Sequence, residues 1–204
     1  MPVNLEYNLL FIHIPKTGGT SIEQFFGMMQ PRALWFGGGA IFVEGGVHFA
    51  PQHFTANILR ERLGESYSRL FKFSFVRDPT SRVLSEYFGS AGGSRTDLVL
   101  DEFSSWLDSY YSARDSDHKL CQRDFLYDES GRLQVDFLGR FENLAEDFGK
   151  LLRQVGHPDW HAKLPRTNES HNRGDYLRCL NEEVRGKIYR LFEADFLTFG
   201  YPKP

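Results

Sequence analysis

The sequence has 204 residues, of which 41% are hydrophobic and 25% charged, with a formal net charge of -3. These values are typical of one globular domain over residues 1–204, and they exclude an overall basic field that attracts nucleic acid or anionic membranes. The sequence contains no apolar run of about 18 residues, which excludes a transmembrane helix, and its N-terminus lacks the basic region of a signal peptide. Cys121 and Cys179 are too few for a disulfide scaffold, so we expect free thiols and a cytoplasmic protein.

The predicted elements alternate between strands and helices. In chain order, apolar patterns first predict a strand at 9–14, a helix at 21–29 capped by Thr20 or Ser21, a glycine-rich loop or loose hairpin at 31–50, and a helix at 53–64. A strand at 69–76, a helix at 79–88, a flexible link at 89–97, a helix at 98–112 and an irregular stretch at 113–130 are predicted next. The last predicted elements are a strand running into a turn at 133–144, a helix at 144–156, a polar loop at 163–176, and a C-terminal helix with a tail at 181–201. Such alternation predicts an α/β fold of three layers, with a mainly parallel central sheet flanked by helices.

The turn between the first strand and the first helix, HIPKTGGTS at 13–21, has the composition of an anion-binding site. Gly18 and Gly19 remove side-chain bulk, so an anion can approach the backbone N–H groups at the start of the helix. The helix dipole adds partial positive charge there, and Lys16 adds a full charge. Hydroxyl donors are present at Thr17, Thr20 and Ser21. The alternative is a glycine-containing turn with a solvated lysine, but the combination in this order favours a phosphate or sulfate site.

This loop differs from the nucleotide-triphosphatase loop G-x-x-x-x-G-K-[ST]. Its lysine precedes the glycines, and the first glycine of that pattern is missing. Thr17 follows the lysine, where the nucleotide-triphosphatase loop places its Mg²⁺-binding hydroxyl, but no apolar run ends in an Asp suited to Mg²⁺. Asp78 lies directly beside Arg77, which favours anion chemistry over Mg²⁺ chemistry.

Two motifs together resemble a known family. HIPKTGGTS resembles the 5′-phosphosulfate loop of sulfotransferases that use 3′-phosphoadenosine 5′-phosphosulfate (PAPS), especially the carbohydrate-modifying branch. FVRDPTSRVLSEYF at 75–88 resembles the second signature of that family, a strand and helix that hold the 3′-phosphate. VDFLGRFENL and EADFLTFGY also resemble the C-terminal half of this branch. The resemblance covers most of the chain and implies a P-loop-like strand–loop–helix that needs no metal.

The resemblance implies roles at both ends of the donor. Lys16 would contact the bridging and 5′-phosphate oxygens as charge builds on the leaving adenosine 3′,5′-bisphosphate, while the rest of the loop donates hydrogen bonds. Arg77 ends a strand, where its guanidinium can bind a phosphate bidentately, and Ser85 follows on the next helix. The alternative for Arg77 is a surface pair with Asp78. In the late polar loop, Arg173 and Gly174 would contact the 3′-phosphate or adenine, and a solvated loop is the alternative.

Sulfuryl transfer to an alcohol needs a base near the acceptor oxygen, and histidine suits this task near neutral pH. By resemblance, His53 at the start of a helix is the expected base, and His48 is the alternative base or a residue of the acceptor pocket. Trp35 could stack on a sugar or belong to the core. His13 is expected as a buried packing residue. The other histidines, including His118, lie in irregular segments with no defined partner, and no histidine spacing indicates a metal site.

The sequence therefore predicts a sulfotransferase that moves the sulfuryl group from PAPS to a hydroxyl acceptor by in-line displacement. The branch resemblance favours a carbohydrate acceptor on a polysaccharide or glycolipid, while small alcohols and phenols, and the oligomeric state, stay open. One rival function is an ATP-dependent kinase of the P-loop superfamily, which would require Mg²⁺. A second rival is a non-catalytic protein that binds adenosine 3′,5′-bisphosphate without turnover.

Overall fold

The computed structural model describes residues 3–28, 42–90, 97–159, 161, 163–165 and 173–204. Its centre is a four-stranded sheet in the order β1–β2–β5–β6. The strands are β1 Val3–Asn4, β2 Leu9–Phe11, β5 Phe71–Val76 and β6 Phe137–Arg140. β2, β5 and β6 are parallel, whereas β1 pairs antiparallel with β2. The predicted α/β class with a mainly parallel sheet is confirmed, and β1 is an additional edge strand.

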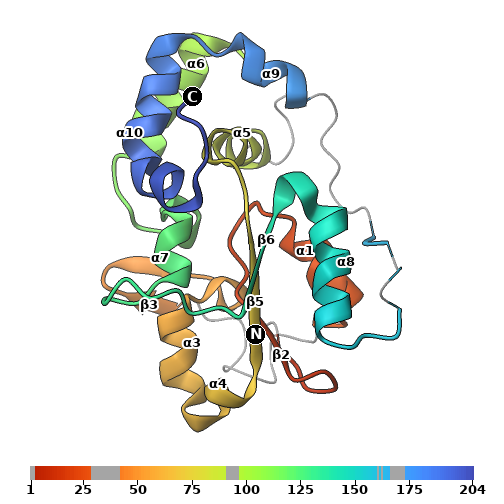
Figure 1. Ribbon diagram of the computed structural model, residues 1–204. Coiled ribbons are helices and arrows are strands. Elements are labelled where there is room, and N and C mark those ends of the chain that lie inside the picture. The colour runs from red at the N-terminus through yellow and green to blue at the C-terminus, as the bar shows by residue number, and fades with distance from the viewer. Residues whose placement is uncertain (1–2, 29–41, 91–96, 160, 162, 166–172) are drawn as a thin grey trace.

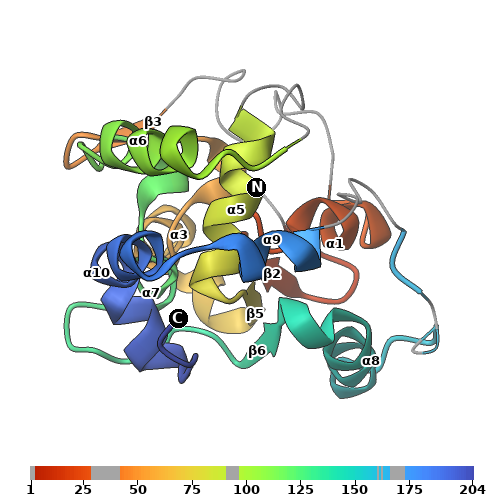
Figure 2. The same ribbon diagram turned by 90° about the horizontal axis from the view of Figure 1, so that it is seen from above.

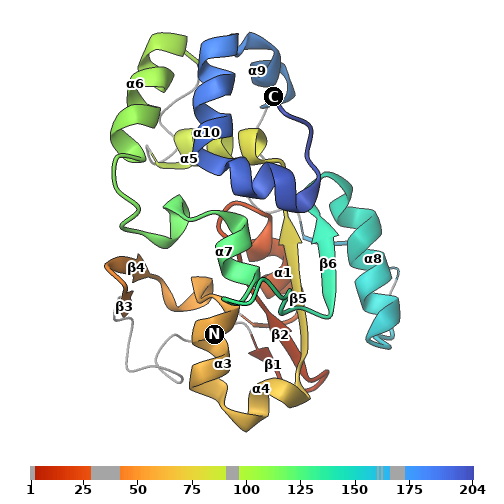
Figure 3. The ribbon, with the colours of Figure 1, turned by 60° about the vertical axis from the view of Figure 1, so that its left-hand side comes forward.

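Helices cover both faces of this sheet (Figures 1 and 3). One face is covered by α1 Gly19–Phe25 and α8 Leu144–Gln154. The other is covered by α3 Ala56–Leu63 and α7 Gln122–Leu126, and α4 Glu65–Arg69 follows α3. The remaining helices, which lie beyond the carboxyl ends of β5 and β6, are α5 Pro79–Ser90, α6 Leu100–Tyr110, α9 Arg173–Cys179 and α10 Glu182–Phe199. Figure 2 shows α5 over the sheet, between the layer of α1 and α8 and the layer of α3 and α7.

Alternation along the strands explains why the sheet is covered on both sides. Leu10 of β2 packs into a core with α3 and α7, while its neighbours Leu9 and Phe11 pack into a second core with α1 and α8. Successive strand residues point to opposite faces, so a strand that is apolar at every position needs a helical layer on each side. A third core joins α5, α6 and α10. None of the helices in the described ranges is long and apolar enough to cross a bilayer.

Several local predictions need correction. The segment 113–130 was expected to be irregular, but it contains the short helices η2 Asp117–Lys119 and α7. Asp195 of α10 accepts hydrogen bonds from the backbone N–H groups of Gln122 and Arg123 at 2.9 Å each, so a residue remote in sequence caps α7. The polar loop predicted over 163–176 gives way to α9 at Arg173.

Other short elements complete the chain. The expected loose hairpin is confirmed for its described part, as β3 Phe42–Glu44 and β4 Val47–Phe49. Two short helices, η1 Pro51–His53 and η3 Phe141–Asn143, precede α3 and α8. Thr55 caps α3, because its side chain accepts a hydrogen bond from the N–H of Ile58 at 3.3 Å.

Candidate active site

The loop between β2 and α1 is tightly curled. Lys16 and Gly18 both have left-handed backbones, with φ of 70° and 86°. A left-handed conformation is unfavourable for a lysine, so the surrounding contacts must hold it. Gly18, rather than Thr20 or Ser21, is the N-cap of α1, and the helix begins at Gly19, earlier than predicted. The helix starts here because a left-handed residue reverses the chain directly before it.

The hydroxyl groups of the loop have different environments. Thr17 is fully buried, and its Oγ1 donates to the backbone carbonyl of Ile14 at 2.9 Å. The hydroxyl hydrogen of Thr17 is therefore used within the loop, and this residue offers a ligand its backbone N–H rather than its side chain. Ser21 is buried and Thr20 is half-buried. The assignment of these side chains to a donor molecule stays a prediction.

The two glycines are required by protein packing as well as by any anion. A Cβ atom added to Gly18 would lie 3.2 Å from side-chain atoms of Phe141 and Leu144. A Cβ atom added to Gly19 would lie 2.1 Å from Nε2 of His13, which leaves no room for a methyl group. The sequence indicated that these glycines make room for a ligand. The structure adds that Gly18 makes room for Phe141 and Leu144, which follow β6, and that Gly19 makes room for His13, which follows β2.

Arg77, at the end of β5, lies directly beside this loop. Its Nη1 donates to the backbone carbonyl of Lys16 at 3.2 Å, and its guanidinium stacks 4.0 Å from the ring centre of Phe141. Gln122 fixes the backbone of Arg77 through two hydrogen bonds of 2.8 Å. Because β2 and β5 are adjacent and parallel, their following loops leave the sheet at the same edge, where α/β folds bind ligands. Arg77 is 9% exposed and is therefore not the surface residue of the alternative interpretation.

Helix α5 contacts the first loop from above. Arg82 of this helix is buried, and its Nε donates to the carbonyl of Pro15 at 3.1 Å. A Cβ atom on Gly89 would lie 2.5 Å from Nζ of Lys16, so the lysine side chain reaches the C-terminal half of α5. Ser85, the predicted partner of Arg77, is buried in the same helix. The loop, Arg77 and α5 thus form one continuous group of residues.

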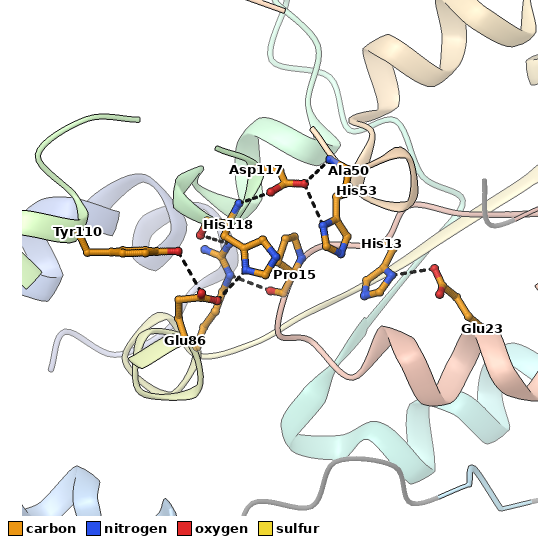
Figure 4. Close-up of polar contacts among 10 residues, drawn as sticks. His13, Pro15, Glu23, Ala50, His53, Glu86, Tyr110, Asp117 and His118 are labelled. Atoms are coloured by element: carbon orange, nitrogen blue, oxygen red, sulfur yellow. Dashed lines mark hydrogen bonds and ion pairs between the residues drawn. The ribbon is translucent and has the colours of Figure 1, made fainter. Parts of the chain in front are cut away.

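Three histidines, each bound to a carboxylate, lie in a row beside this loop (Figure 4). The Nδ1 atoms lie 2.8 Å from Glu23 for His13, 3.0 Å from Asp117 for His53, and 2.8 Å from Glu86 for His118. The ring centre of His53 is 4.7 Å from that of His13 and 5.2 Å from that of His118. Tyr110 donates to the other oxygen of Glu86 at 3.0 Å. We refer to these three histidine–carboxylate pairs as the histidine row.

Burial and hydrogen bonding determine the charges in the histidine row. Burial lowers the pKa of His53 from 6.5 to about 4, although the hydrogen bond to Asp117 opposes this and the neighbouring histidines reinforce it. Burial would raise the pKa of Asp117, but the hydrogen bonds from His53 and from the N–H of Ala50 outweigh it and lower that pKa. For Glu86, burial is likewise outweighed by His118, Lys16 and Tyr110, so its pKa is also lowered. At neutral pH, ionised Asp117 and ionised Glu86 therefore lie on either side of His118, and Asp117 faces a neutral His53.

Metal binding is a second chemical possibility at this point. His53, Asp117 and His118 each offer a ligand atom, and these atoms lie within 4.8 Å of one another. Both oxygens of Asp117 already accept hydrogen bonds, from Ala50 at 2.8 Å, from His53 at 3.0 Å and from the N–H of His118 at 2.8 Å. These hydrogen bonds use three of the about four acceptor positions of the carboxylate, so Asp117 already acts as the acceptor of a hydrogen-bonded acid–base pair with His53.

The remaining predicted residues are less well placed. The side chain of His48 on β4 is exposed, whereas His53 is buried in the histidine row. Trp35 lies outside the described residues. Arg173 and Gly174 begin α9, which packs against α5 through Phe88 and Tyr176, whose ring centres are 5.0 Å apart. The side chain of Arg173 also lies outside what the structure describes.

Sequence reasoning missed the carboxylates of the histidine row and the place of His118. Asp117 is 64 residues from His53, and Glu86 is 32 residues from His118. No periodic pattern links residues at these separations. His13 is buried, as predicted, but its Nδ1 is also hydrogen-bonded to Glu23 of α1 at 2.8 Å.

The low pKa of His53 predicts a pH-dependent stability. In the unfolded chain His53 binds a proton below pH 6.5, whereas in the folded protein it stays neutral down to about pH 4. Proton uptake therefore favours the unfolded state in this range, and the contribution of neutral His53 to the free energy of unfolding is full above pH 6.5 and is lost as the pH falls toward 4. We expect His53→Asn to be less stable than the wild type at about pH 7.5, with the gap narrowing by roughly 2 to 3 kcal/mol at about pH 4.5. Urea unfolding at both pH values measures this gap, and His48→Asn is the exposed control. A gap that does not change with pH would contradict the assignment.

Comparisons with known proteins were consistent with the geometry. A family model described as "Sulfotransferase family" matches residues 1–202. Carbohydrate sulfotransferase 12 of Xenopus laevis is 23% identical over 252 residues, covering 99% of this chain and 60% of the relative. Carbohydrate sulfotransferase 14 of Danio rerio is 24% identical over 244 residues, covering 99% of this chain and 62% of the relative. The chain thus spans about three fifths of the length of these curated relatives. No solved structure showed a significant match.

Proposed function

Because this chain belongs to the sulfotransferase family, we propose that it transfers a sulfuryl group from PAPS to a hydroxyl group of a carbohydrate. The observation that carries the proposal is the contact between the two predicted anion motifs, in which Arg77 donates to the carbonyl of Lys16 at 3.2 Å. PAPS carries a 5′-phosphosulfate and a 3′-phosphate on one nucleoside. A protein that binds it needs two cationic sites side by side, and Lys16 and Arg77 supply them at one edge of the sheet.

In this proposal, the loop at residues 15–21, which we call the donor loop, binds the 5′-phosphosulfate through its backbone N–H groups and Lys16. Arg77 and Ser85, at the end of β5 and on α5, bind the 3′-phosphate. Arg77 is suited to this role because its guanidinium is oriented by the Phe141 ring and by the carbonyl of Lys16. A guanidinium fixed in this way loses little conformational entropy when it binds a phosphate bidentately. Arg173 and Gly174 would complete the nucleotide site from the start of α9.

The proposed chemical step is an in-line displacement at sulfur. The acceptor oxygen forms a new bond to sulfur while the bond from sulfur to the bridging oxygen of the donor breaks. His53 takes the proton of the acceptor hydroxyl on Nε2, and Lys16 stabilises the negative charge that develops on adenosine 3′,5′-bisphosphate. His53 is neutral at physiological pH because of its low pKa, so its imidazole is ready to accept this proton.

The carbohydrate acceptor is proposed from the names of the relatives, which are carbohydrate sulfotransferases. Nothing in the chemistry of the step requires a metal, which distinguishes it from ATP-dependent phosphoryl transfer. The family match favours sulfuryl transfer over the kinase. The non-catalytic alternative differs only in turnover, so it is tested by an assay with labelled PAPS and a mixed set of polysaccharides.

A thermal-shift comparison tests the donor site directly. Adenosine 3′,5′-bisphosphate should raise the melting temperature equally with and without EDTA, whereas ATP with Mg²⁺ should have a much smaller effect. At about 100 times its dissociation constant, a ligand stabilises the folded state by about 2.7 kcal/mol. Stabilisation by ATP with Mg²⁺ but not by adenosine 3′,5′-bisphosphate, if it is lost on adding EDTA, would instead support the kinase.

Arg77→Ala is expected to weaken binding of adenosine 3′,5′-bisphosphate by roughly 10- to 100-fold, because a charge-assisted phosphate contact contributes about 1.5 to 3 kcal/mol. Isothermal titration calorimetry measures the affinity. Arg132→Ala is the matched control, because Arg132 is exposed on the turn before β6. An unchanged affinity for the bisphosphate in a folded Arg77→Ala variant would remove Arg77 from the donor site.

A further inference from the structure

Asp117 lies where three hydrogen-bond donors meet. Its Oδ2 accepts from Nδ1 of His53 at 3.0 Å and from the N–H of Ala50 at 2.8 Å, and its Oδ1 accepts from the N–H of His118 at 2.8 Å. Asp117 is 4% exposed. We propose that Asp117 is a positioning residue that holds His53 in the tautomer with a proton on Nδ1, so that Nε2 is free to accept the proton of the acceptor hydroxyl. The role in catalysis rests on the proposed function.

The donors around residue 117 require a carboxylate. The backbone N–H groups of Ala50 and His118 can only donate, so both oxygens at position 117 must accept. An asparagine has only one acceptor oxygen. In either orientation of its amide, the NH₂ group would face one of these two N–H groups, so two donors would oppose each other. Asp117 meets all three donors as an ionised carboxylate, in agreement with its lowered pKa. Nδ1 of His53 faces this charge and therefore donates to it.

The tautomer of His53 follows from this hydrogen bond. The hydrogen bond at one ring nitrogen of a histidine determines which nitrogen carries the proton. A proton on Nδ1 leaves the lone pair on Nε2, and a general base needs an unprotonated nitrogen. Among the described residues, Nε2 of His53 has no hydrogen-bond partner. Asp117 thus makes Nε2 the basic atom without touching the substrate itself.

The groups that face His53 come from several segments. His13 follows β2, Asp117 and His118 belong to η2, and His118 is in turn bound to Glu86 of α5 at 2.8 Å. Each histidine of the row has its own carboxylate on Nδ1. Replacing one carboxylate should therefore change the tautomer of its own histidine and leave the others unchanged. This separation provides internal controls for the test.

The test is the ¹⁵N NMR spectrum of the histidine side chains in the full chain, at about pH 7, which is well above the pKa of about 4 of His53. In the wild type we expect a protonated, pyrrole-type Nδ1 and an unprotonated, pyridine-type Nε2 for His53, assigned by loss of the signals in His53→Asn. In Asp117→Ala the proton should move to Nε2 in most molecules. Glu86→Gln should alter the spectrum of His118 while that of His53 stays as in the wild type.

Turnover provides the second measurement. Asp117→Ala should lower kcat by roughly 100-fold or more, because the base is then in the wrong tautomer. The affinity for adenosine 3′,5′-bisphosphate should stay within about twofold, because Asp117 does not belong to the donor site. Asp108→Asn is the matched control, since Asp108 is an exposed carboxylate of α6 paired with Lys187. Asp117→Leu serves as a second variant in case the alanine variant folds poorly, because leucine also removes both acceptor oxygens but fills more of the space of the carboxylate.

The outcomes are separable. A proton on Nε2 of His53 in the wild type, or an unchanged tautomer in both folded Asp117 variants, would overturn the proposal. A changed tautomer with full turnover, while His53→Asn is inactive, would also overturn it, because positioning would then be unnecessary. If the wild type transfers sulfate to no acceptor, the proposed function fails, and the tautomer measurement still decides whether Asp117 orients His53.

Discussion

Replacement of Lys16 by methionine is expected to lower kcat for sulfuryl transfer by about 100- to 1,000-fold. Lys16 is the mobile full charge of the donor loop, and charge develops on the bridging oxygen only as the bond to sulfur breaks. Loss of a preorganised group that stabilises such charge typically costs about 3 to 4 kcal/mol. Methionine lacks the Nζ position but keeps an unbranched, apolar side chain as far as Cε, so the packing of the lysine stem toward α5 at Gly89 is largely preserved. Turnover of labelled PAPS measures the effect.

A control variant separates this effect from a general loss of positive charge. Lys150→Met removes an exposed lysine of α8 that pairs with Glu146 at 2.9 Å, and it should leave kcat unchanged. Exposed pairs of this kind contribute little to stability. If the Lys16→Met enzyme kept normal kcat and lost only affinity for PAPS, Lys16 would be a binding residue and not a stabiliser of the transition state.

His53→Asn is expected to lower kcat by roughly 100- to 10,000-fold, the usual contribution of general acid–base catalysis. Asparagine can still donate a hydrogen bond to Asp117, but it cannot take a proton. The affinity for adenosine 3′,5′-bisphosphate should be retained, because His53 lies in the histidine row and not in the donor loop. Steady-state kinetics together with calorimetry of the bisphosphate measure the two effects.

His48→Asn tests the alternative base in the same assay. His48 is exposed on β4, and we expect its replacement to leave kcat unchanged. An inactive His48 variant beside an active His53 variant would exchange the two assignments. Loss of bisphosphate binding in His53→Asn would show instead that the substitution disturbs the donor loop.

The arrangement of the anion motifs could be predicted because it depends on local patterns. The apolar runs at 9–14 and 69–76 indicated buried parallel strands, and parallel strands bring their carboxyl ends to one edge. That rule alone brings Lys16 and Arg77 together, as the 3.2 Å hydrogen bond from Arg77 to the carbonyl of Lys16 shows. The helical layers could be predicted because strands and helices alternate along the sequence, which is typical of a parallel sheet covered by helices.

The histidine row could not be predicted, because it depends on long-range pairing. Asp117 and His118 lie in a segment without periodicity, and their partners His53 and Glu86 belong to other elements. Helix α7 has a local capping box of Cys121 and Asp124, which was missed in the sequence, and Asp195 of α10 adds a long-range cap at the same end. The contacts of the histidine row and the cap from Asp195 exist only after the chain has folded. Sequence patterns report the neighbours within one turn or one strand, and these partners are much farther apart.

The contact of Gly19 with His13 has a consequence for how this protein can diverge. A side chain at position 19 would occupy the place of Nε2 of His13, and the His13 ring stands edge-on to His53 with 4.7 Å between ring centres. A larger residue at position 19 therefore requires a smaller or displaced side chain at position 13. Because the ring at 13 also packs against the proposed base, a substitution at position 19 reaches His53 through one intervening side chain.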